Sequence, residues 1–307
     1  MMESLAAALG RVTVQIVAYN SREALQRQQA LLAQLPRLTV IDNGGRDDLA
    51  AWMAEALPQA RCLSLPANIG FGRAHNLGVT DCETPFALLL NPDCVIQPEA
   101  IVQLLHCLEA HPDALMSVPA LRYPDGRLQE NHRGFFHTRG SARGGYDVPA
   151  GETCCEMVSG AVLMVRVETF RRIGGFDPWF FLYWEDEELC IRARQQRLAV
   201  ILAPQSTACH VAQTSSAPST RTTFLRHYCY TGSKLYLRRK LGEGLPLVCA
   251  RALGTLLPSL LSLPWLLLSG QRVKAVRNAA RAVAVLTAPW QLRRARSAAL
   301  PSQLWRD

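Results

Sequence analysis

The sequence predicts an α/β domain with a mostly parallel central sheet, followed by a helical extension of different character. Short runs of aliphatic and β-branched residues alternate with segments whose apolar residues recur at helical spacing, an order typical of parallel strands joined by helical crossovers. Polar residues directly follow four of these apolar runs. A third observation sets the extension apart, because beyond residue 222 the chain becomes strongly basic and rich in Leu and Ala.

The expected elements follow from these runs and from their end signals. Ser21 is a candidate N-cap for the first crossover helix, and Pro36 stops that helix. The expected strands are residues 12–17, 38–41, 61–65, 86–90, 158–165 and 198–202. The expected helices of this domain are residues 22–35, 48–57, 73–79, 98–110, 167–173 and 185–196. Residues 122–146, rich in Gly, Arg, His and aromatic side chains, are expected to form a loop.

Charge and cysteine usage narrow the class of protein. The net charge of +8 is unevenly spread, since residues 219–307 hold 15 Lys and Arg against 2 Asp and Glu, whereas the preceding part is mildly acidic. A basic tail indicates an anionic partner, either a nucleic acid or a membrane surface. The ten cysteines contain no Cys-x-x-Cys pair, which favours reduced thiols in the cytosol over a zinc site or a disulfide framework.

The most informative strand end is Asn91-Pro92-Asp93, after the apolar run 86–90. In parallel sheets, ligands bind beyond the carboxyl ends of the strands. A carboxylate at this position can hold Mg²⁺ or Mn²⁺, and such an ion offsets charge on a diphosphate. The alternative interpretation is that Asp93 caps the helix that begins near Pro98.

A glycine-rich turn lies between the third strand and the third helix, from Asn68 to Gly78. Gly70 and Gly72 let the backbone approach a ligand, and Arg73 together with the helix N-terminus offers positive charge to a phosphate. The turn lacks the Gly-Lys-Ser/Thr of a Walker loop. It also follows the third strand, whereas a dinucleotide-binding fingerprint follows the first.

Four adjacent carboxylates begin the helix at residues 185–196. They could simply compensate the helix dipole. Aromatic residues precede them, however, and an aromatic wall beside carboxylates suits a sugar and raises a carboxylate pKa by desolvation. Glu185 or Asp186 could therefore accept a proton from an acceptor hydroxyl. The aromatic residues are Phe176, Trp179, Phe180, Phe181, Tyr183 and Trp184.

The order and spacing of these motifs resemble those of the inverting family-2 glycosyltransferases, specifically their rhamnosyltransferase-like branch. The resemblance covers residues 12–240. The motifs that carry it are Val17-Ala18-Tyr19-Asn20, Ile41-Asp42-Asn43, Asn68-Ile69-Gly70-Phe71-Gly72, Asn76, Asn91-Pro92-Asp93, Ser159-Gly160-Ala161, Gly174-Gly175-Phe176-Asp177, Glu185-Asp186 and His210. The resemblance implies a GT-A fold, which is Rossmann-like. The catalytic domain would span residues 1–222, with a nucleotide-binding part at about 10–115 and an acceptor-binding part at about 116–222.

The resemblance also implies roles for individual residues. Asp186 would be the general base with Glu185 beside it, and Asp93 would bind the divalent cation, Mg²⁺ or Mn²⁺, with His210 completing its shell. The acceptor would be bordered by Gly160, Ala161 and Trp184. The donor would be held by Ala18, Tyr19, Asn20, Asp42, Asn43, Asn68, Gly70, Arg73, Asn76, Asn91 and Asp93. Two positions depart from the family pattern, since Asn91 replaces the first Asp of Asp-x-Asp and no glycine follows His210.

The expected reaction is direct displacement, in which inversion accompanies transfer of a sugar from a nucleoside diphosphate. On the resemblance, the donor is dTDP-rhamnose and the sugar L-rhamnose, and a UDP-hexose donor is the alternative. The acceptor is expected to be a lipid-linked glycan or a polysaccharide. A metal-dependent nucleotidyltransferase is the rival enzyme, but it would need a basic glycine-rich loop where Tyr19-Asn20-Ser21 stands.

The extension, residues 223–307, is expected to be helical and to associate with a membrane. Residues 245–268 are apolar but contain prolines, which favours a hairpin or an in-plane helix over a true span. Residues 271–296 are expected to form a basic amphipathic helix. No signal peptide is visible. The protein is therefore expected in the cytoplasm, peripheral on the inner face of the cell membrane, and the basic tail is expected to contact anionic lipid rather than nucleic acid.

Overall fold

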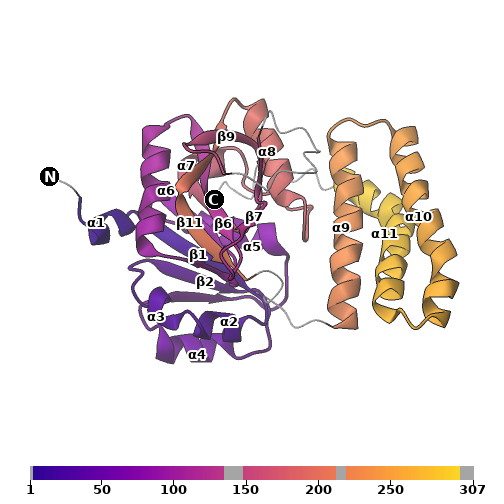
Figure 1. Ribbon diagram of the computed structural model, residues 1–307, viewed down its shortest axis with the longest axis horizontal. Helices are drawn as coiled ribbons and strands as arrows, with labels where there is room; N and C mark the ends of the chain where they lie inside the picture. Colours follow the sequence, from indigo (N-terminus) through magenta and orange to yellow (C-terminus); the bar gives the residue numbers. More distant parts are fainter. Residues whose placement is uncertain (1–2, 135–147, 212–218, 298–307) are drawn as a thin grey trace. The chain divides into compact units, whose positions relative to one another are not determined.

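The computed structural model describes residues 3–134, 148–211 and 219–297, and it divides the chain into two compact units (Figure 1). Unit 1 comprises Met1–Asp177 and Glu185–Ser216. Unit 2 comprises Ala217–Asp307 together with the short segment Pro178–Trp184. This segment had been assigned to the catalytic domain from the sequence, yet it belongs to the helical unit because its aromatic side chains pack on the first helix of that unit.

Unit 1 is built on a mixed sheet with the strand order β3-β2-β1-β4-β10-β6-β11-β9-β8, with β5 paired to β11 and β7 paired to β6. Its first four strands are parallel, as expected, whereas β10 runs antiparallel to both of its neighbours. The strands are β1 (Val12–Ala18), β2 (Leu38–Asp42), β3 (Arg61–Ser64), β4 (Phe86–Leu90), β5 (Cys94–Ile96), β6 (Ala114–Arg122), β7 (Leu128–Gln129), β8 (His132–Gly134), β9 (Thr153–Val158), β10 (Val162–Arg166) and β11 (Ala199–His210).

Helices cover both faces of this sheet (Figure 1). Side chains alternate between faces along a strand, so in β4 Phe86, Leu88 and Leu90 pack with α1, α2, α3, α4 and α6, while Ala87 and Leu89 pack with α5, α7 and α8. Burial on both faces explains the unbroken apolar run of β4. The helices are α1 (Leu5–Leu9), α2 (Arg22–Gln26), α3 (Gln29–Leu32), α4 (Leu49–Ala56), α5 (Phe71–Thr80), α6 (Pro98–Ala110), α7 (Val167–Arg172) and α8 (Glu185–Gln195).

Three local predictions need correction. The expected helix 22–35 is two short helices, and the break coincides with buried Gln28, whose amide donates to the Pro92 carbonyl at 2.9 Å. The expected strand 198–202 extends to His210, because beyond an irregularity at Ala203 to Thr207 it pairs with β5 and with the end of β6. The expected loop 122–146 contains β7 and β8, and its residues 135–147 lie outside the described ranges.

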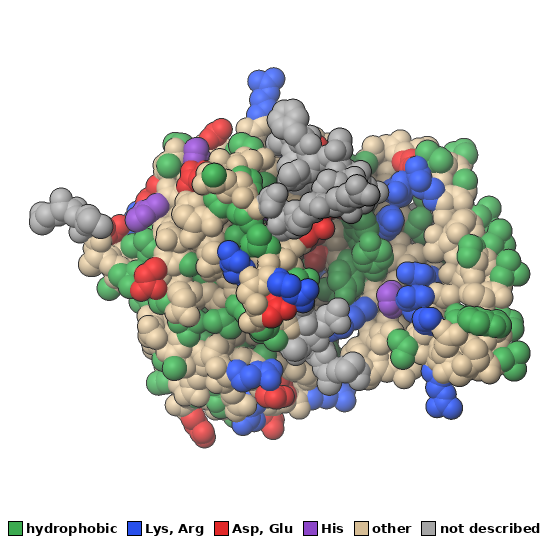
Figure 2. All heavy atoms as spheres, in the orientation of Figure 1, with side chains coloured by type: hydrophobic (Ala, Val, Ile, Leu, Met, Phe, Trp, Pro, Cys, Tyr) green, Lys and Arg blue, Asp and Glu red, His purple; other side chains and the backbone are tan. Residues whose placement is uncertain are grey.

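Unit 2 consists of three long helices, α9 (Thr220–Lys240), α10 (Leu245–Leu268) and α11 (Arg272–Ser297), in which α11 packs against both of the others (Figure 1). The core that they enclose is small, with Leu235, Val248, Val285 and Ala288 at its centre. Figure 2 shows hydrophobic side chains along the edge of this unit that α10 forms, and basic side chains gathered on the same unit.

Of the two forms expected for residues 245–268, the hairpin is wrong, because α10 is one continuous helix of 24 residues with Pro258 and Pro264 inside it; whether that helix lies in the plane of a membrane stays a prediction. An interior proline removes one helical hydrogen bond but does not reverse the chain by itself. No Gly, Asn or Asp lies within three residues of either proline to form a turn. By length and composition, α10 could cross a membrane, and only 11% of its most apolar window is buried.

Candidate active site

Side chains tie together the loops that follow β1, β2 and β3. Asn20, in the left-handed region at φ 52°, accepts a hydrogen bond from the Arg46 N–H at 2.8 Å. Asn43 donates to Asn68 Oδ1 at 3.1 Å and accepts from the Ile69 N–H at 2.9 Å. The carboxyl ends of three strands therefore form one connected edge, as the sequence predicted.

Close backbone packing at this edge explains the two glycines after Asp42. Gly44 has φ +74°, and a Cβ there would lie 2.4 Å from the carbonyl carbon of Ala67. The Gly45 N–H donates to Asp42 Oδ1 at 2.9 Å. Tyr19 and Asn20 are exposed and Asp42 is half-buried, so a ligand can reach these three predicted donor contacts.

A carboxylate, an imidazole and a thiol meet at the end of β4. The donor atoms of Asp93, Cys94 and His210 all lie within 4.8 Å of one another, and His210 Nε2 is 3.6 Å from Asp93 Oδ1. The antiparallel pairing of β5 with β11 causes this meeting, since it sets His210 opposite Cys94. The sequence interpretation named Asp93 and His210, and the structure brings these two side chains together.

The second ring nitrogen of His210 has its own partner. Its Nδ1 lies 3.1 Å from Gln129 Oε1, an acceptor to which a protonated Nδ1 can donate, and its Nε2 faces Asp93. Burial, followed by the charge of Asp93, raises the pKa of the Cys94 thiol well above its usual value. A carboxylate oxygen and a neutral imidazole nitrogen suit Mn²⁺ or Mg²⁺ better than a soft metal, so the cluster fits a divalent cation of this kind.

The two carboxylates at the start of α8 differ in their surroundings. Asp186 accepts hydrogen bonds from the N–H groups of Gly160 at 2.9 Å and Glu187 at 2.8 Å, one on each oxygen. Glu185 is buried, and its Oε2 has no hydrogen-bond partner among the residues that the structure describes. Asp186 is therefore held in a fixed orientation by the backbone, whereas Glu185 is desolvated.

These surroundings give Glu185 and Asp186 different tendencies to hold a proton. Burial, and then the neighbouring Asp186, raise the pKa of Glu185 to about 8. Burial also raises the pKa of Asp186, although hydrogen bonds from Gly160 and Glu187 oppose the rise. With a pKa of about 8, Glu185 holds a proton at neutral pH, so Asp186 is the better candidate of the pair for a proton acceptor.

Backbone contacts connect Asp186, the predicted base, to Asp93, the predicted metal ligand. Gly160 binds Asp186, and the carbonyl of the next residue, Ala161, accepts from the Asn91 N–H at 2.9 Å. Asn91 lies two residues before Asp93 and closes a turn with Cys94. The boundary between β4 and β10 therefore positions both carboxylates at the same edge of the sheet.

A comparison with known protein families matches residues 13–167, half of the chain, to the family "Glycosyl transferase family 2". The chain belongs to glycosyl transferase family 2. Two N-acetylglucosaminyl-diphospho-decaprenol L-rhamnosyltransferases of Mycobacterium tuberculosis strains are each 27% identical over 197 residues, which are 55% of this chain and 64% of theirs. Rhamnosyltransferase WbbL of Escherichia coli K12 is 23% identical over 161 residues, 47% of this chain and 61% of that protein.

Another relative is the low-salt glycan biosynthesis hexosyltransferase Agl10 of Haloferax volcanii, 23% identical over 62% of this chain and 64% of its own length. The chain therefore spans less than two thirds of the length of these relatives. Among solved structures, the mannosyltransferase PcManGT of Pyrobaculum calidifontis, in complex with GDP-Man and Mn²⁺, matches 91% of this chain and 87% of its own, with a TM-score of 0.55 and 14% identity. GalNAc-T7 with UDP, GalNAc and Mn²⁺ matches 73% of this chain and 50% of its own, with a TM-score of 0.50 and 14% identity.

These findings confirm the predicted fold class and the predicted enzyme class, a glycosyltransferase with a GT-A-like fold. The family match favours a glycosyltransferase over the nucleotidyltransferase alternative.

The predicted donor residues of this chain differ in their exposure to solvent. Arg73 is exposed on the first turn of α5, and Asn68 is half-buried. Ala18, Asn43 and Gly70 are buried.

Asn76, a predicted donor residue, makes two hydrogen bonds to the backbone of Phe176. Its Nδ2 donates to the Phe176 carbonyl at 2.7 Å, and its Oδ1 accepts from the Phe176 N–H at 2.8 Å. Gly175 permits this approach, since a Cβ there would lie 2.4 Å from Asn76 Oδ1. Asn76 therefore connects α5 to the turn that precedes residue 177, and its role in donor binding stays a prediction.

The predicted aromatic wall is wrong as a continuous surface. Phe176 and Phe180 are fully buried, and Trp179 stacks on Tyr236 with ring centroids 3.7 Å apart. These rings stabilise the core of each unit because large aromatic surfaces gain most from burial. Phe181, by contrast, is 42% exposed.

The residues just before α8 are strained. Tyr183 and Trp184 have φ values of 70° and 73°, in a region that costs a non-glycine residue about 1–3 kcal/mol. Contacts within unit 2 hold Trp184, since its Nε1 donates to the Tyr230 carbonyl at 3.1 Å and Lys234 Nζ lies 5.5 Å from its ring centroid. Such strain is typical of functional turns, and the acceptor-binding role of Trp184 stays a prediction.

Sequence reasoning missed Cys94 and Gln129 near the metal cluster. Cys94 follows Asp93 in the chain, but adjacency alone does not show that its thiol faces His210. Gln129 lies 81 residues from His210, and the strand pairing that brings them together leaves no local signal. The polar side chain of Gln129 within the short strand β7 was the one sequence feature that pointed to a role for this residue.

Proposed function

We propose that this glycosyltransferase transfers L-rhamnose from dTDP-rhamnose to a lipid-linked glycan or polysaccharide, with inversion at the anomeric carbon. The observation that carries the proposal is the Asp186 carboxylate, fixed by two backbone N–H groups and connected through Gly160 and Ala161 to the Asn91-Pro92-Asp93 turn. Support for the sugar comes from the relatives of Mycobacterium tuberculosis and Escherichia coli, which are named rhamnosyltransferases.

In the proposed reaction, Asp186 accepts the proton of an acceptor hydroxyl. The oxygen forms a bond to the anomeric carbon from the side opposite the leaving group, and the bond from that carbon to the phosphate oxygen breaks. Single displacement inverts the configuration and releases the nucleoside diphosphate. Protonated Glu185 keeps a second negative charge away from Asp186, so Asp186 alone acts as the base.

Asp93 and His210 are proposed to hold a divalent cation, Mg²⁺ or Mn²⁺, with Cys94 beside it. When bound, the ion would offset negative charge on the diphosphate. Tyr19, Asn20 and Asp42, which are accessible at the ends of β1 and β2, are proposed to hold the nucleoside. Gly160, Ala161 and Trp184 are proposed to border the acceptor.

We further propose that the enzyme works in the cytoplasm, at the inner face of the cell membrane. Support comes from the exposed leucines of α10 and from the basic side chains of α9 and α11, a combination that suits an anionic lipid surface. The relatives of Mycobacterium tuberculosis carry a decaprenol-linked acceptor in their names, which agrees with a substrate at the membrane.

A UDP-hexose is the second candidate donor, favoured by the hexosyltransferase of Haloferax volcanii among the relatives. The test incubates the purified chain with dTDP-rhamnose or UDP-glucose, with and without Mn²⁺, and a short-chain N-acetylglucosaminyl-diphospho-prenol. We expect Mn²⁺-stimulated release of dTDP and a rhamnosylated product with inverted configuration by NMR. Turnover of UDP-glucose alone would refute the rhamnose assignment, and turnover of neither donor would refute the acceptor class as well.

A further inference from the structure

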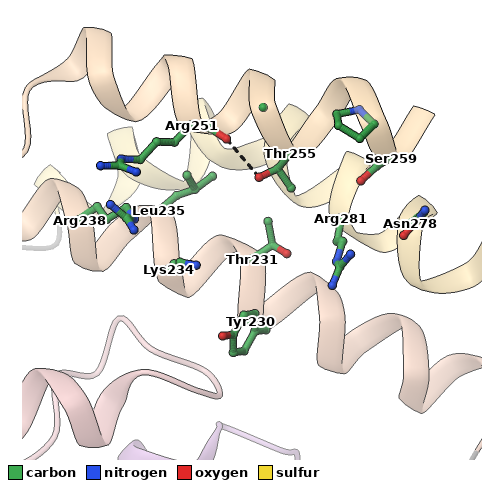
Figure 3. Close-up of a pocket in the computed structure, with 12 residues that line it drawn as sticks. Tyr230, Thr231, Lys234, Leu235, Arg238, Arg251, Thr255, Ser259, Asn278 and Arg281 are labelled. Atoms are coloured by element: carbon green, nitrogen blue, oxygen red, sulfur yellow. Dashed lines mark hydrogen bonds between the residues drawn. The ribbon is translucent and has the colours of Figure 1, made fainter. Parts of the chain in front are cut away.

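A cavity of about 490 Å³ opens between the three helices of unit 2, away from the residues of the active site in the sequence (Figure 3). Its basic lining comes from every helix, with Lys234 and Arg238 on α9, Arg251 on α10 and Arg281 on α11. Thr255 and Ser259 of α10 add hydroxyl groups. None of the described residues that line the cavity is acidic, so its chemistry is that of an anion site.

The protein compensates only part of this positive charge. Glu243 Oε1 lies 2.6 Å from Arg251 Nε and 3.3 Å from Arg238 Nη1, so a single carboxylate serves two guanidinium groups. Arg281 has no carboxylate partner among the described residues. Burial, and then the nearby Arg277, lower the pKa of Arg281. A partly desolvated arginine of this kind gains most from an anion that enters the cavity.

The helix that forms one wall of the cavity also carries an apolar surface. On α10, Arg251, Thr255 and Ser259 line the cavity, while Leu261 is 79% and Leu268 90% exposed. Other exposed apolar residues of this helix are Leu253, Leu257, Leu260, Trp265 and Leu267. A ligand that joins a strongly anionic group to a long apolar chain would complement both surfaces of α10.

We propose that this cavity binds the diphosphate group of a polyprenyl lipid, with the prenyl chain along the exposed leucines of α10. The proposal rests on the proposed function in one respect, since that lipid is taken to carry the acceptor glycan. Arginine matches phosphate oxygens through paired N–H groups, and cavities of this volume are usual for small ligands.

The first experiment measures binding of farnesyl diphosphate to the full chain by equilibrium dialysis. Arg281→Gln removes the uncompensated charge, and the matched control is Arg272→Gln, an exposed arginine on the same helix outside the cavity. We expect Arg281→Gln to weaken binding at least tenfold and Arg272→Gln to change it less than twofold. Equal losses in the two variants would show a diffuse charge effect and would overturn the proposal.

A second variant fills part of the cavity without changing any charged residue. Gly254 lines the cavity, and a Cβ added there meets no atom within 4 Å. Gly254→Leu should therefore fold, because leucine is also the better helix former. We expect it to lose farnesyl diphosphate binding at least tenfold at unchanged melting temperature. Full binding by Gly254→Leu would place the ligand elsewhere and refute the site.

Three further ligands show which part of farnesyl diphosphate the cavity recognises. Farnesol tests the apolar chain alone, inorganic diphosphate tests the anion alone, and dihexanoyl phosphatidylglycerol tests an ordinary anionic lipid. We expect each to bind at least tenfold more weakly than farnesyl diphosphate. Equal binding of any of the three would overturn the polyprenyl assignment. None of these readouts involves sugar transfer, so failure of the donor test and failure of this proposal are separate results.

Discussion

The two units of the chain use their apolar residues in opposite ways. In unit 1, Phe170, Leu88 and Leu89 are fully buried, and two extended clusters fill both faces of the sheet. In unit 2, by contrast, four buried residues form the central cluster, and leucines of α10 are exposed. A helix bundle that leaves this much apolar surface exposed resembles an interaction surface more than a core. Stability and chemistry are therefore concentrated in unit 1, and contact with a lipid surface is expected from unit 2.

The polar groups show the same contrast. Unit 1 orients carboxylates at defined positions, buried Asp93 beside His210 and half-buried Asp186 under the Gly160 N–H, each with a named partner. Unit 2 arranges basic side chains around a cavity with one carboxylate for two arginines. Buried, oriented groups suit bond making, whereas an excess of one charge suits capture of a ligand of opposite charge. Substitutions that affect one unit alone should separate catalysis from membrane binding.

The largest expected effect is on catalysis. Asp186→Asn keeps the shape and the hydrogen bond from Gly160 but cannot accept a proton, so the rate of transfer should fall by about 10³-fold. Binding to liposomes that contain anionic lipid should remain unchanged, because the substitution lies in unit 1. The measurement is the turnover number with the best donor, alongside co-sedimentation. A fully active Asp186→Asn variant would show that Asp186 is not the catalytic base.

The second effect is on stability against pH. The pKa of Glu185 is raised to about 8 in the folded chain from an ordinary value of 4.5, so the folded state holds an extra proton between these pH values. Stability from this group is therefore fully present below about pH 4.5 and is lost as pH rises from there through 8, by roughly 5 kcal/mol in all. Glu185→Gln should abolish that loss, whereas Glu55→Gln, at an exposed position, should retain it.

Melting temperatures at pH 5, 6, 7 and 8 measure this second effect. The wild-type chain and Glu55→Gln should both melt progressively lower as pH rises, and Glu185→Gln should show a flatter profile. Identical profiles for all three proteins would mean that Glu185 is ionised and solvated in the folded chain, contrary to its burial.

The smallest expected effect is on membrane binding. Leu261→Glu replaces an apolar residue that is 79% exposed on α10 and adds a charge that anionic lipid repels, so liposome affinity should fall about tenfold. Leu5→Glu, at a leucine that is 42% exposed on α1, is the control. Release of nucleoside diphosphate from a soluble donor should be unaffected by either change. Equal liposome binding by both variants would exclude the α10 surface as the contact.

Much of the site could be predicted because its residues follow strands. Asp42, Asn43 and Asp93 stand directly after apolar runs, and the carboxyl ends of parallel strands meet at one edge of a sheet. The same reasoning failed to predict the contact of Asn76, whose amide binds the backbone of Phe176, 100 residues away. It also failed for the aromatic wall, because an apolar ring next to a carboxylate in sequence can equally enter the core, as Phe180 does.

The sequence by itself determined the alternation of strands and helices, the polar strand ends and the change of charge near residue 219, because each depends on residues close together in the chain. The tertiary structure alone decided the antiparallel place of β10, the meeting of Cys94 and Gln129 with His210, and the cavity between α9, α10 and α11. Each of these depends on pairing or packing between distant segments. The free energy of such contacts comes from burial and hydrogen bonds that no local pattern encodes.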